Sequence, residues 1–262
     1  MIVEYNRPQT LDQALQLLAR QSPVTVPMGG GTRLNQPSPQ AVAVVDLQTL
    51  AAQPESGLGE VHQVGAVLKV GAAVTLQALL DFQALLPALQ EVIRLETSYN
   101  LRQVATVAGT LVSATGRSPF ASALLALDAQ MDVTSLAQGS FQLALGDIFA
   151  LRSKLRPHSL VMAIEIPVRV RLAYQYVART PADFPIVAAA MANWPSGRTR
   201  LALAGFGSAP VLAADGPESA GIEIAARAAF AAAGDEWASA EYRSAMAEIL
   251  ARRCINLLDG GK

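Results

Sequence analysis

Two short segments combine glycine with hydroxyl side chains, a composition suited to binding an anion. The first glycine segment (residues 28–34) reads Met-Gly-Gly-Gly-Thr-Arg-Leu, and the second (residues 106–110) reads Thr-Val-Ala-Gly-Thr, with Ser113 close behind. Glycine has no side chain to keep a ligand away from backbone N–H groups, and Thr32 adds a hydroxyl donor. The triplet alone is more typical of a tight turn. Together, the two segments suggest a site that holds one diphosphate between them.

The remaining composition excludes several other kinds of site. The single cysteine, Cys254, cannot form an internal disulfide or a thiolate metal site, and His62 and His158 lack metal-ligand spacing. The net charge of −1, without a basic block, gives no electrostatic footprint for nucleic acid. We therefore identify no metal site, and we can name no catalytic acid or base. The lone cysteine, with no secretory signal and no apolar run of membrane length, predicts a cytoplasmic protein without a membrane span.

The elements around the first glycine segment are those of an α/β unit. Thr10 and Gln13 form a capping box, which predicts a helix over residues 11–18. Apolar runs predict strands at 24–26 and 42–47, the second covered on both faces. The first glycine segment thus directly follows a strand. We expect the second to be a similar strand-like approach to a glycine turn.

The pattern changes after Pro167, where an apolar strand over 160–166 ends. The expected strands beyond it are residues 169–177, 186–192 and 199–206, followed by a loop at 213–221 and helices at 222–233 and 242–257. The alanine-rich segment 186–192 is also consistent with a helix. We place a domain boundary near 168, which gives domains of residues 1–168 and 169–262. The first domain divides into subdomains of about 1–52 and 53–168.

The glycine segments and their surroundings resemble the FAD-binding (medium) subunit of molybdenum hydroxylases. This group includes the carbon monoxide dehydrogenase medium subunit and the flavin domain of xanthine dehydrogenase. The similarity begins at Pro8 and the helix over 11–18, continues through Gly29–Leu34, Leu101–Thr110 and Ala123–Ala129, and returns at Leu145–Phe149 and near Leu201–Gly205. It therefore covers nearly the whole chain, and its specificity comes from the order and spacing of these segments.

The resemblance implies an α+β fold. A p-cresol methylhydroxylase-like FAD-binding fold of two α/β subdomains would be followed by a small C-terminal domain with an antiparallel sheet and helices. FAD would lie extended between the subdomains, with its pyrophosphate on the backbone of both glycine segments. The residues that the resemblance assigns to FAD are Met28, Gly29, Gly30, Gly31, Thr32, Arg33, Leu34, Thr106, Gly109, Thr110, Ser113, Leu160 and Val161. The last two align with a strand beside the isoalloxazine ring, and they are equally consistent with plain core.

The resemblance also implies a function: an oxidoreductase subunit that transfers electrons and performs no substrate chemistry. A large partner would hold the molybdenum cofactor, and a small partner would hold the [2Fe–2S] clusters that pass electrons through FAD to an external acceptor. The complex would be a hetero-oligomer.

Two alternatives remain. Ala108, Thr110 and Pro119 depart from the family pattern, and a positive φ at Ala108 would add strain of about 1 kcal/mol or more. These departures allow a flavin-free structural or assembly subunit derived from the same fold. A stand-alone flavin oxidase would use the same first segment, but the chain is short and lacks a substrate domain with paired catalytic residues.

Overall fold

The computed structural model describes residues 1–36, 40–155 and 158–260. The chain forms two compact units. Unit 1 consists of Met1–Gln83, Ser98–Ser113 and Ala129–Ile166, and unit 2 consists of Ala84–Thr97, Ala114–Asp128 and Pro167–Lys262. Two segments that precede the predicted boundary near 168 therefore belong to unit 2. Within the described ranges, no helix has the length and apolar character that crossing a membrane requires.

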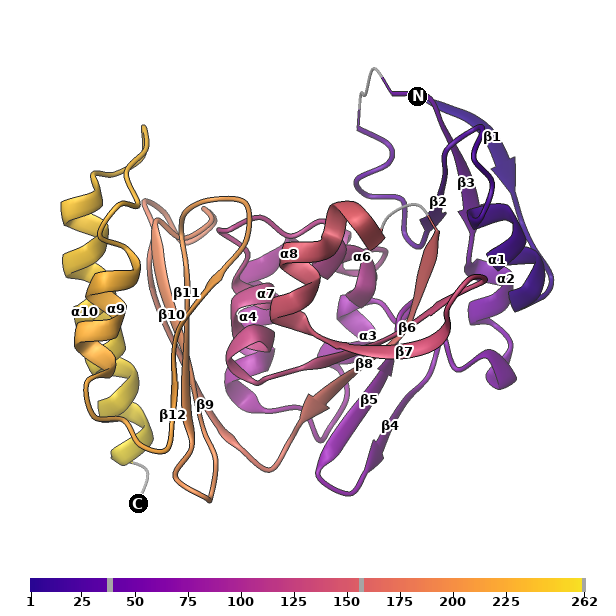
Figure 1. Ribbon diagram of the computed structural model, residues 1–262. Coiled ribbons are helices and arrows are strands. Elements are labelled where there is room, and N and C mark those ends of the chain that lie inside the picture. The colour runs from indigo at the N-terminus through magenta and orange to yellow at the C-terminus, as the bar shows by residue number, and fades with distance from the viewer. Residues whose placement is uncertain (37–39, 156–157, 261–262) are drawn as a thin grey trace. The chain divides into compact units, whose positions relative to one another are not determined.

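Unit 1 begins with a three-stranded parallel sheet in the order β1 (Ile2–Asn6), β3 (Val42–Asp46), β2 (Thr25–Met28) (Figure 1). Helix α1 (Leu11–Leu18) begins at Thr10, whose hydroxyl accepts a hydrogen bond from the Gln13 N–H at 3.3 Å, as the capping box predicted. Two short helical turns follow β3, α2 (Gln48–Ala51) and η1 (Pro54–Ser56). Because the strands are parallel, their carboxyl ends share one edge of the sheet, and there β2 leads into the first glycine segment.

The second sheet of unit 1 has five strands in the order β4 (Val61–Val64), β5 (Val67–Gly71), β8 (Ser159–Pro167), β6 (Gln130–Ser135), β7 (Gly139–Ala144). The unit also contains helices α3 (Leu76–Leu80), α5 (Tyr99–Arg102), α6 (Val107–Val112) and α8 (Leu145–Leu155). Lys69 on β5 bridges Asp132 on β6, at 2.5 Å, and Glu165 on β8, at 3.4 Å. This cross-strand ion cluster favours the observed pairing of the strands.

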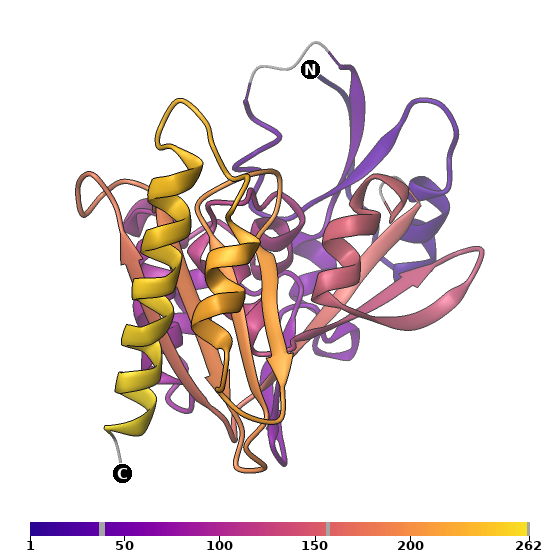
Figure 2. The same ribbon diagram turned by 60° about the vertical axis from the view of Figure 1, so that its left-hand side comes forward.

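Unit 2 is built on an antiparallel sheet in the order β12 (Val211–Gly216), β11 (Thr199–Ala204), β10 (Val187–Asn193), β9 (Arg171–Val177). Helices α9 (Ile222–Ala229) and α10 (Ala240–Asp259) lie across one face (Figure 2). Helices α4 (Pro87–Glu96) and α7 (Pro119–Ala126) pack on the strands as well, α7 against β10 and β11 and α4 against β9.

The fold is therefore α+β, as the resemblance implied, and the open question about residues 186–192 is settled as a strand. All but the last residue of β10 are buried, because its alternate side chains pack on helices at both faces. Because both faces are buried, the segment is apolar throughout, and the sequence shows no alternation of apolar and polar residues that would identify a strand. The loop predicted over 213–221 is wrong in its first part, where β12 continues to Gly216. This edge strand is half-exposed and alanine-rich, so its sequence carries a weak strand signal.

Candidate functional site

The structure brings the two glycine segments into direct contact within unit 1. A Cβ atom placed on Gly29 would lie 2.6 Å from Thr106 Oγ1, and one on Gly30 would lie 1.6 Å from the Val104 carbonyl oxygen. Only residues without a side chain allow the backbones to approach so closely. Gly31 has a different requirement, since its φ of +70° is in the left-handed region. Each glycine of the triplet thus has a structural reason of its own, independent of any ligand.

The backbone donors of the first segment are what point to a ligand. Within the residues that the structure describes, the N–H groups of residues 29–34 donate no hydrogen bond. The carbonyls nearby do have partners: Gly31 accepts from the Asn35 N–H at 3.0 Å and Met28 accepts from the Leu47 N–H at 3.0 Å. A loop that combines a run of unpaired N–H groups with a residue in the left-handed region has the features of an anion-binding nest.

The second segment has a different local structure from the predicted one. Instead of a strand-like approach to a glycine turn, Thr106 is the N-cap of helix α6, and its side-chain oxygen accepts from the Gly109 N–H at 3.3 Å. The amides that begin the helix are occupied: Val107 donates to the Val74 carbonyl at 2.8 Å and Ala108 to the Ala72 carbonyl at 3.2 Å. Thr106, with apolar residues at helical spacing behind it, was the sequence signal for this helix.

The hydroxyl groups of this segment are unequal as donors. Thr110 donates to the Thr106 carbonyl at 2.8 Å, and Ser113 donates to the Gly109 carbonyl at 2.7 Å. The Thr106 hydroxyl only accepts, from Gly109, and its own proton has no acceptor among the described residues. Thr106 is 8% exposed and lies against Gly29, so this proton, like the Thr32 hydroxyl, is a donor available to a ligand at the first segment.

The positions that depart from the resembled pattern are accommodated without strain. Among the described residues other than glycine, only Asp128 has a positive φ, so Ala108, inside helix α6, incurs no left-handed penalty. Pro119 is the first residue of α7, directly after the N-cap Ser118, where proline is favoured. It belongs to unit 2, whereas every residue assigned to FAD from the sequence belongs to unit 1.

Leu160 and Val161 follow one another on β8, so their side chains point to opposite faces of the five-stranded sheet. Leu160 is buried and opposite Thr134, while Val161 is half-buried and opposite Val133. The two side chains cannot both line one ligand. Leu160 fits the core interpretation, and Val161 retains accessible surface.

Charge near the first segment comes from Arg33 and Asp46. Arg33 is exposed and makes no ion pair within the described residues. Asp46, opposite Met28 at the end of β3, has a fully buried side chain that accepts hydrogen bonds from Arg7, from Tyr5 and from a backbone amide. Burial alone would raise the pKa of Asp46, but these hydrogen bonds hold it below the usual value.

Asp46 therefore ties the ends of β1 and β3 together at the edge of the sheet where β2 enters the first segment. Asp46 was not among the site residues predicted from the sequence. Its only sequence signal was a carboxylate that ends an otherwise apolar strand.

The sequence model of the family described as the FAD binding domain in molybdopterin dehydrogenase matches residues 1–169. No curated protein matches the chain in sequence.

Solved structures with the same fold cover nearly the whole chain. A chain of the Cu,Mo-CO dehydrogenase in its cyanide-inactivated form has a TM-score of 0.80 and 23% identity, over 98% of this chain and 97% of that one. A chain of quinoline 2-oxidoreductase from Pseudomonas putida 86 has a TM-score of 0.76 and 23% identity, with the same coverage. A chain of carbon monoxide dehydrogenase from Hydrogenophaga pseudoflava has a TM-score of 0.76 and 20% identity, over 97% and 96%.

Proposed function

Because the chain belongs to the family of FAD binding domains in molybdopterin dehydrogenase, we propose that it is the electron-transfer subunit of a molybdenum hydroxylase complex. The family makes it an FAD-binding part of an oxidoreductase. In the proposed complex, a large partner holds the molybdenum cofactor and a small partner holds [2Fe–2S] clusters. The chain has one cysteine, so residues 1–262 cannot hold such a cluster, which fits its place on a partner. Bound FAD supplies the ability to accept electrons and pass them to an external acceptor.

The run of unpaired N–H groups at residues 29–34 carries the proposal, because it fits the diphosphate of FAD. Anionic oxygens accept strong, charge-assisted hydrogen bonds from such donors. The Thr106 hydroxyl is placed to add a neutral donor and the Arg33 guanidinium a positive charge. The second segment then packs against the first and supports its conformation. Its own helix amides are not free to bind FAD, because they donate to the Val74 and Ala72 carbonyls.

The proposed site differs in one respect from the scheme in which both segments bind the pyrophosphate through their backbones. The donors come mainly from residues 29–34, whereas Gly109, Thr110 and Ser113 support helix α6 through hydrogen bonds within the chain. Val161 is the better candidate of the β8 pair to line the cofactor.

A titration of the purified chain with FAD tests the proposal. We expect near-stoichiometric flavin absorbance, and we expect Arg33→Gln to weaken binding by about 10-fold or more, because one charge-assisted hydrogen bond contributes about 1.5–3 kcal/mol. Arg33→Lys is the matched control: it keeps the charge, so binding should retain its dependence on ionic strength. A colourless chain that takes up no added FAD would refute the proposed site.

The titration, an assay of turnover and co-purification of partners together separate the alternatives. A flavin-free structural subunit takes up no FAD, and its case is weaker now that Ala108 is helical and Thr110 hydrogen-bonds within the chain. A stand-alone oxidase would turn over a small alcohol or hydroxy acid without partners. Co-purification of a molybdenum subunit and a cysteine-rich subunit supports the electron-transfer proposal and the hetero-oligomer, which we place in the cytoplasm.

A further inference from the structure

In unit 2, Arg243 on α10 is fully buried. Its guanidinium donates to three backbone carbonyls, at 3.1 Å to Ile186, 2.8 Å to Ala233 and 3.2 Å to Ala238. It also donates to the Asp235 carboxylate at 2.8 Å. Burying a guanidinium is unfavourable unless its donors are used, and here they fix the loop between α9 and α10.

This loop presents Trp237 at the surface. The Trp237 N–H and the Ala238 N–H both donate to the Asp235 carboxylate, at 2.8 and 3.2 Å, and the same oxygen accepts from Arg243. Trp237 is nevertheless 40% exposed. A large aromatic side chain is thus held in one place and left in contact with water, an arrangement that lowers the entropy cost of binding a partner.

Two arginines lie over the Trp237 ring. The Arg117 guanidinium carbon is 4.6 Å from the ring centroid, and that of Arg179 is 4.7 Å from it. Arg117 is fixed by donating to the Pro185 carbonyl at 3.0 Å and the Phe184 carbonyl at 2.8 Å. The Phe184 side chain is itself 42% exposed. We call Arg117, Arg179, Phe184 and Trp237 the Trp237 surface.

The two arginines of the Trp237 surface keep guanidinium N–H groups that no described carboxylate binds. Neither Arg117 nor Arg179 forms an ion pair with any described carboxylate. Burial lowers the pKa of Arg117, and nearby Arg243 and Arg179 lower it further, against the opposite effect of Asp235 and Asp183.

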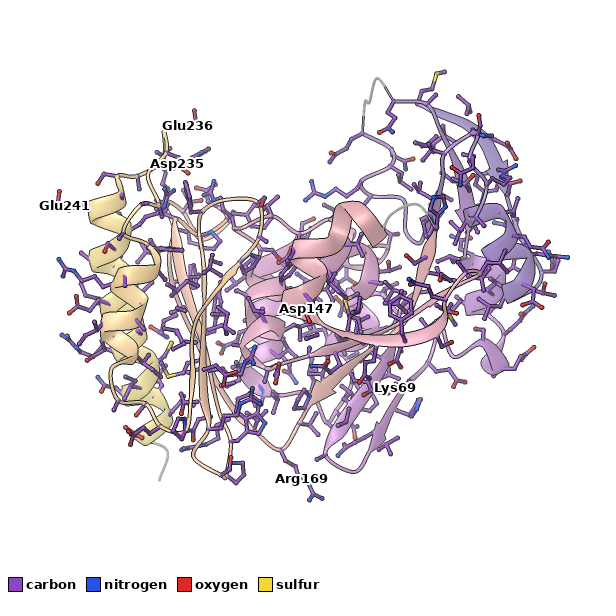
Figure 3. All side chains as sticks on the ribbon, in the orientation of Figure 1. Lys69, Asp147, Arg169, Asp235, Glu236 and Glu241 are labelled. Atoms are coloured by element: carbon purple, nitrogen blue, oxygen red, sulfur yellow. The ribbon has the colours of Figure 1, made fainter. Side chains whose placement is uncertain are left out.

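The other carboxylates of the loop region do not change this. In Figure 3, Glu236 and Glu241 extend outward from the loop and from the start of α10. No described ion pair joins either of them to the Trp237 surface.

We propose that the Trp237 surface is a docking site for a carboxylate-bearing segment of a partner subunit. The proposal rests on the proposed function, which requires partners. Tryptophan and arginine are the residues most enriched among interface positions with large binding energies. A guanidinium with free N–H groups recognises a carboxylate through paired hydrogen bonds. A second copy of the chain is disfavoured, because a twofold contact would bring the same arginines together.

Footprinting of the intact complex tests the proposal. The complex is purified from the producing cells through a tag on this chain, and its molybdenum and iron–sulfur subunits are identified by mass spectrometry. The chain contains two tryptophans, so Trp194 is an internal control for oxidation of Trp237. We expect Trp237 to be oxidised in the free chain and protected at least about fivefold in the complex, with Trp194 unchanged. Equal oxidation of Trp237 in both states overturns the proposal.

Variants test the chemistry of the partner. Trp237→Ala should weaken association with the partner subunits by about 30-fold or more, as expected for a central aromatic residue. The double variant Arg117→Gln, Arg179→Gln should weaken it and remove its dependence on ionic strength, while the double lysine variant keeps that dependence. A wild-type association that is insensitive to salt overturns the assignment of a carboxylate partner. If the variants dissociate a homodimer of this chain and leave the hetero-complex intact, the occupant is a second copy, and the assignment of a partner subunit is overturned.

FAD titration of the same variants separates this proposal from the proposed function. All of them should bind FAD as the wild type does, and their thermal transitions should show that they are folded. A chain that binds FAD in a complex where Trp237 stays exposed overturns the docking site alone. A chain without any molybdenum or iron–sulfur partner overturns both.

Discussion

Gly30→Ala is the sharpest perturbation of the first glycine segment. The new Cβ would lie 1.6 Å from the Val104 carbonyl oxygen, whereas real contacts of this kind are essentially never below 3.0 Å. The obstacle is backbone and not a flexible side chain, so the first segment and the backbone at Val104 must separate by roughly 1.4 Å. Overpacking of this kind costs about 1–3 kcal/mol. For a chain of this size we expect the melting temperature to fall by about 2–12 °C.

The effect of Gly30→Ala on FAD should exceed its effect on stability. If the displaced loop loses two charge-assisted hydrogen bonds of about 1.5–3 kcal/mol each, the affinity falls by at least about 100-fold. FAD fluorescence quenching and thermal denaturation measure the two quantities on one sample. Gly65→Ala is the matched control, because the φ of Gly65 is +61° and no atom lies within 4 Å of the new Cβ. This variant should lose about 1 kcal/mol of unfolding free energy and bind FAD normally. Wild-type FAD affinity in Gly30→Ala would refute the reasoning.

Three further predictions test other groups. Burial would raise the pKa of Asp46, but hydrogen bonds from Tyr5, a backbone amide and Arg7 outweigh it and lower the pKa. The stability that this carboxylate adds is therefore lost as the pH falls below about 4. Asp46→Asn should therefore show a shallower loss of melting temperature between pH 5 and 2, and an unchanged slope would contradict the assignment. Burial raises the pKa of the Cys254 thiol to about 12, so a thiol reagent at pH 8 should label it only after unfolding. Rapid labelling of the native chain would contradict the burial of Cys254 on α10. Thr110→Val should change FAD affinity less than about threefold, because its hydroxyl is bound to a backbone carbonyl, and a large loss would make it a ligand.

The sequence predicted the elements whose signals are local. The helix over 11–18 followed from its cap and spacing, and the apolar run at 42–47 marked a covered strand. The order of the glycine segments was sufficient to suggest the family. Residues 186–192 were ambiguous because burial on both faces removes the alternation that distinguishes a strand from a helix.

The tertiary structure decided which donors are free to bind. Glycine and threonine at 28–34 and 106–110 predicted two equivalent binding loops, but whether an N–H is available depends on carbonyls distant in the sequence. Ala72 and Val74 occupy the amides of α6, while residues 29–34 find no acceptor among the described residues. The buried Arg243 and the Trp237 that it presents likewise depend on carbonyls from two separate segments, the residue before β10 and the loop between α9 and α10. Composition and order thus indicated what the chain binds, and long-range hydrogen bonding decided which backbone donors are left unpaired.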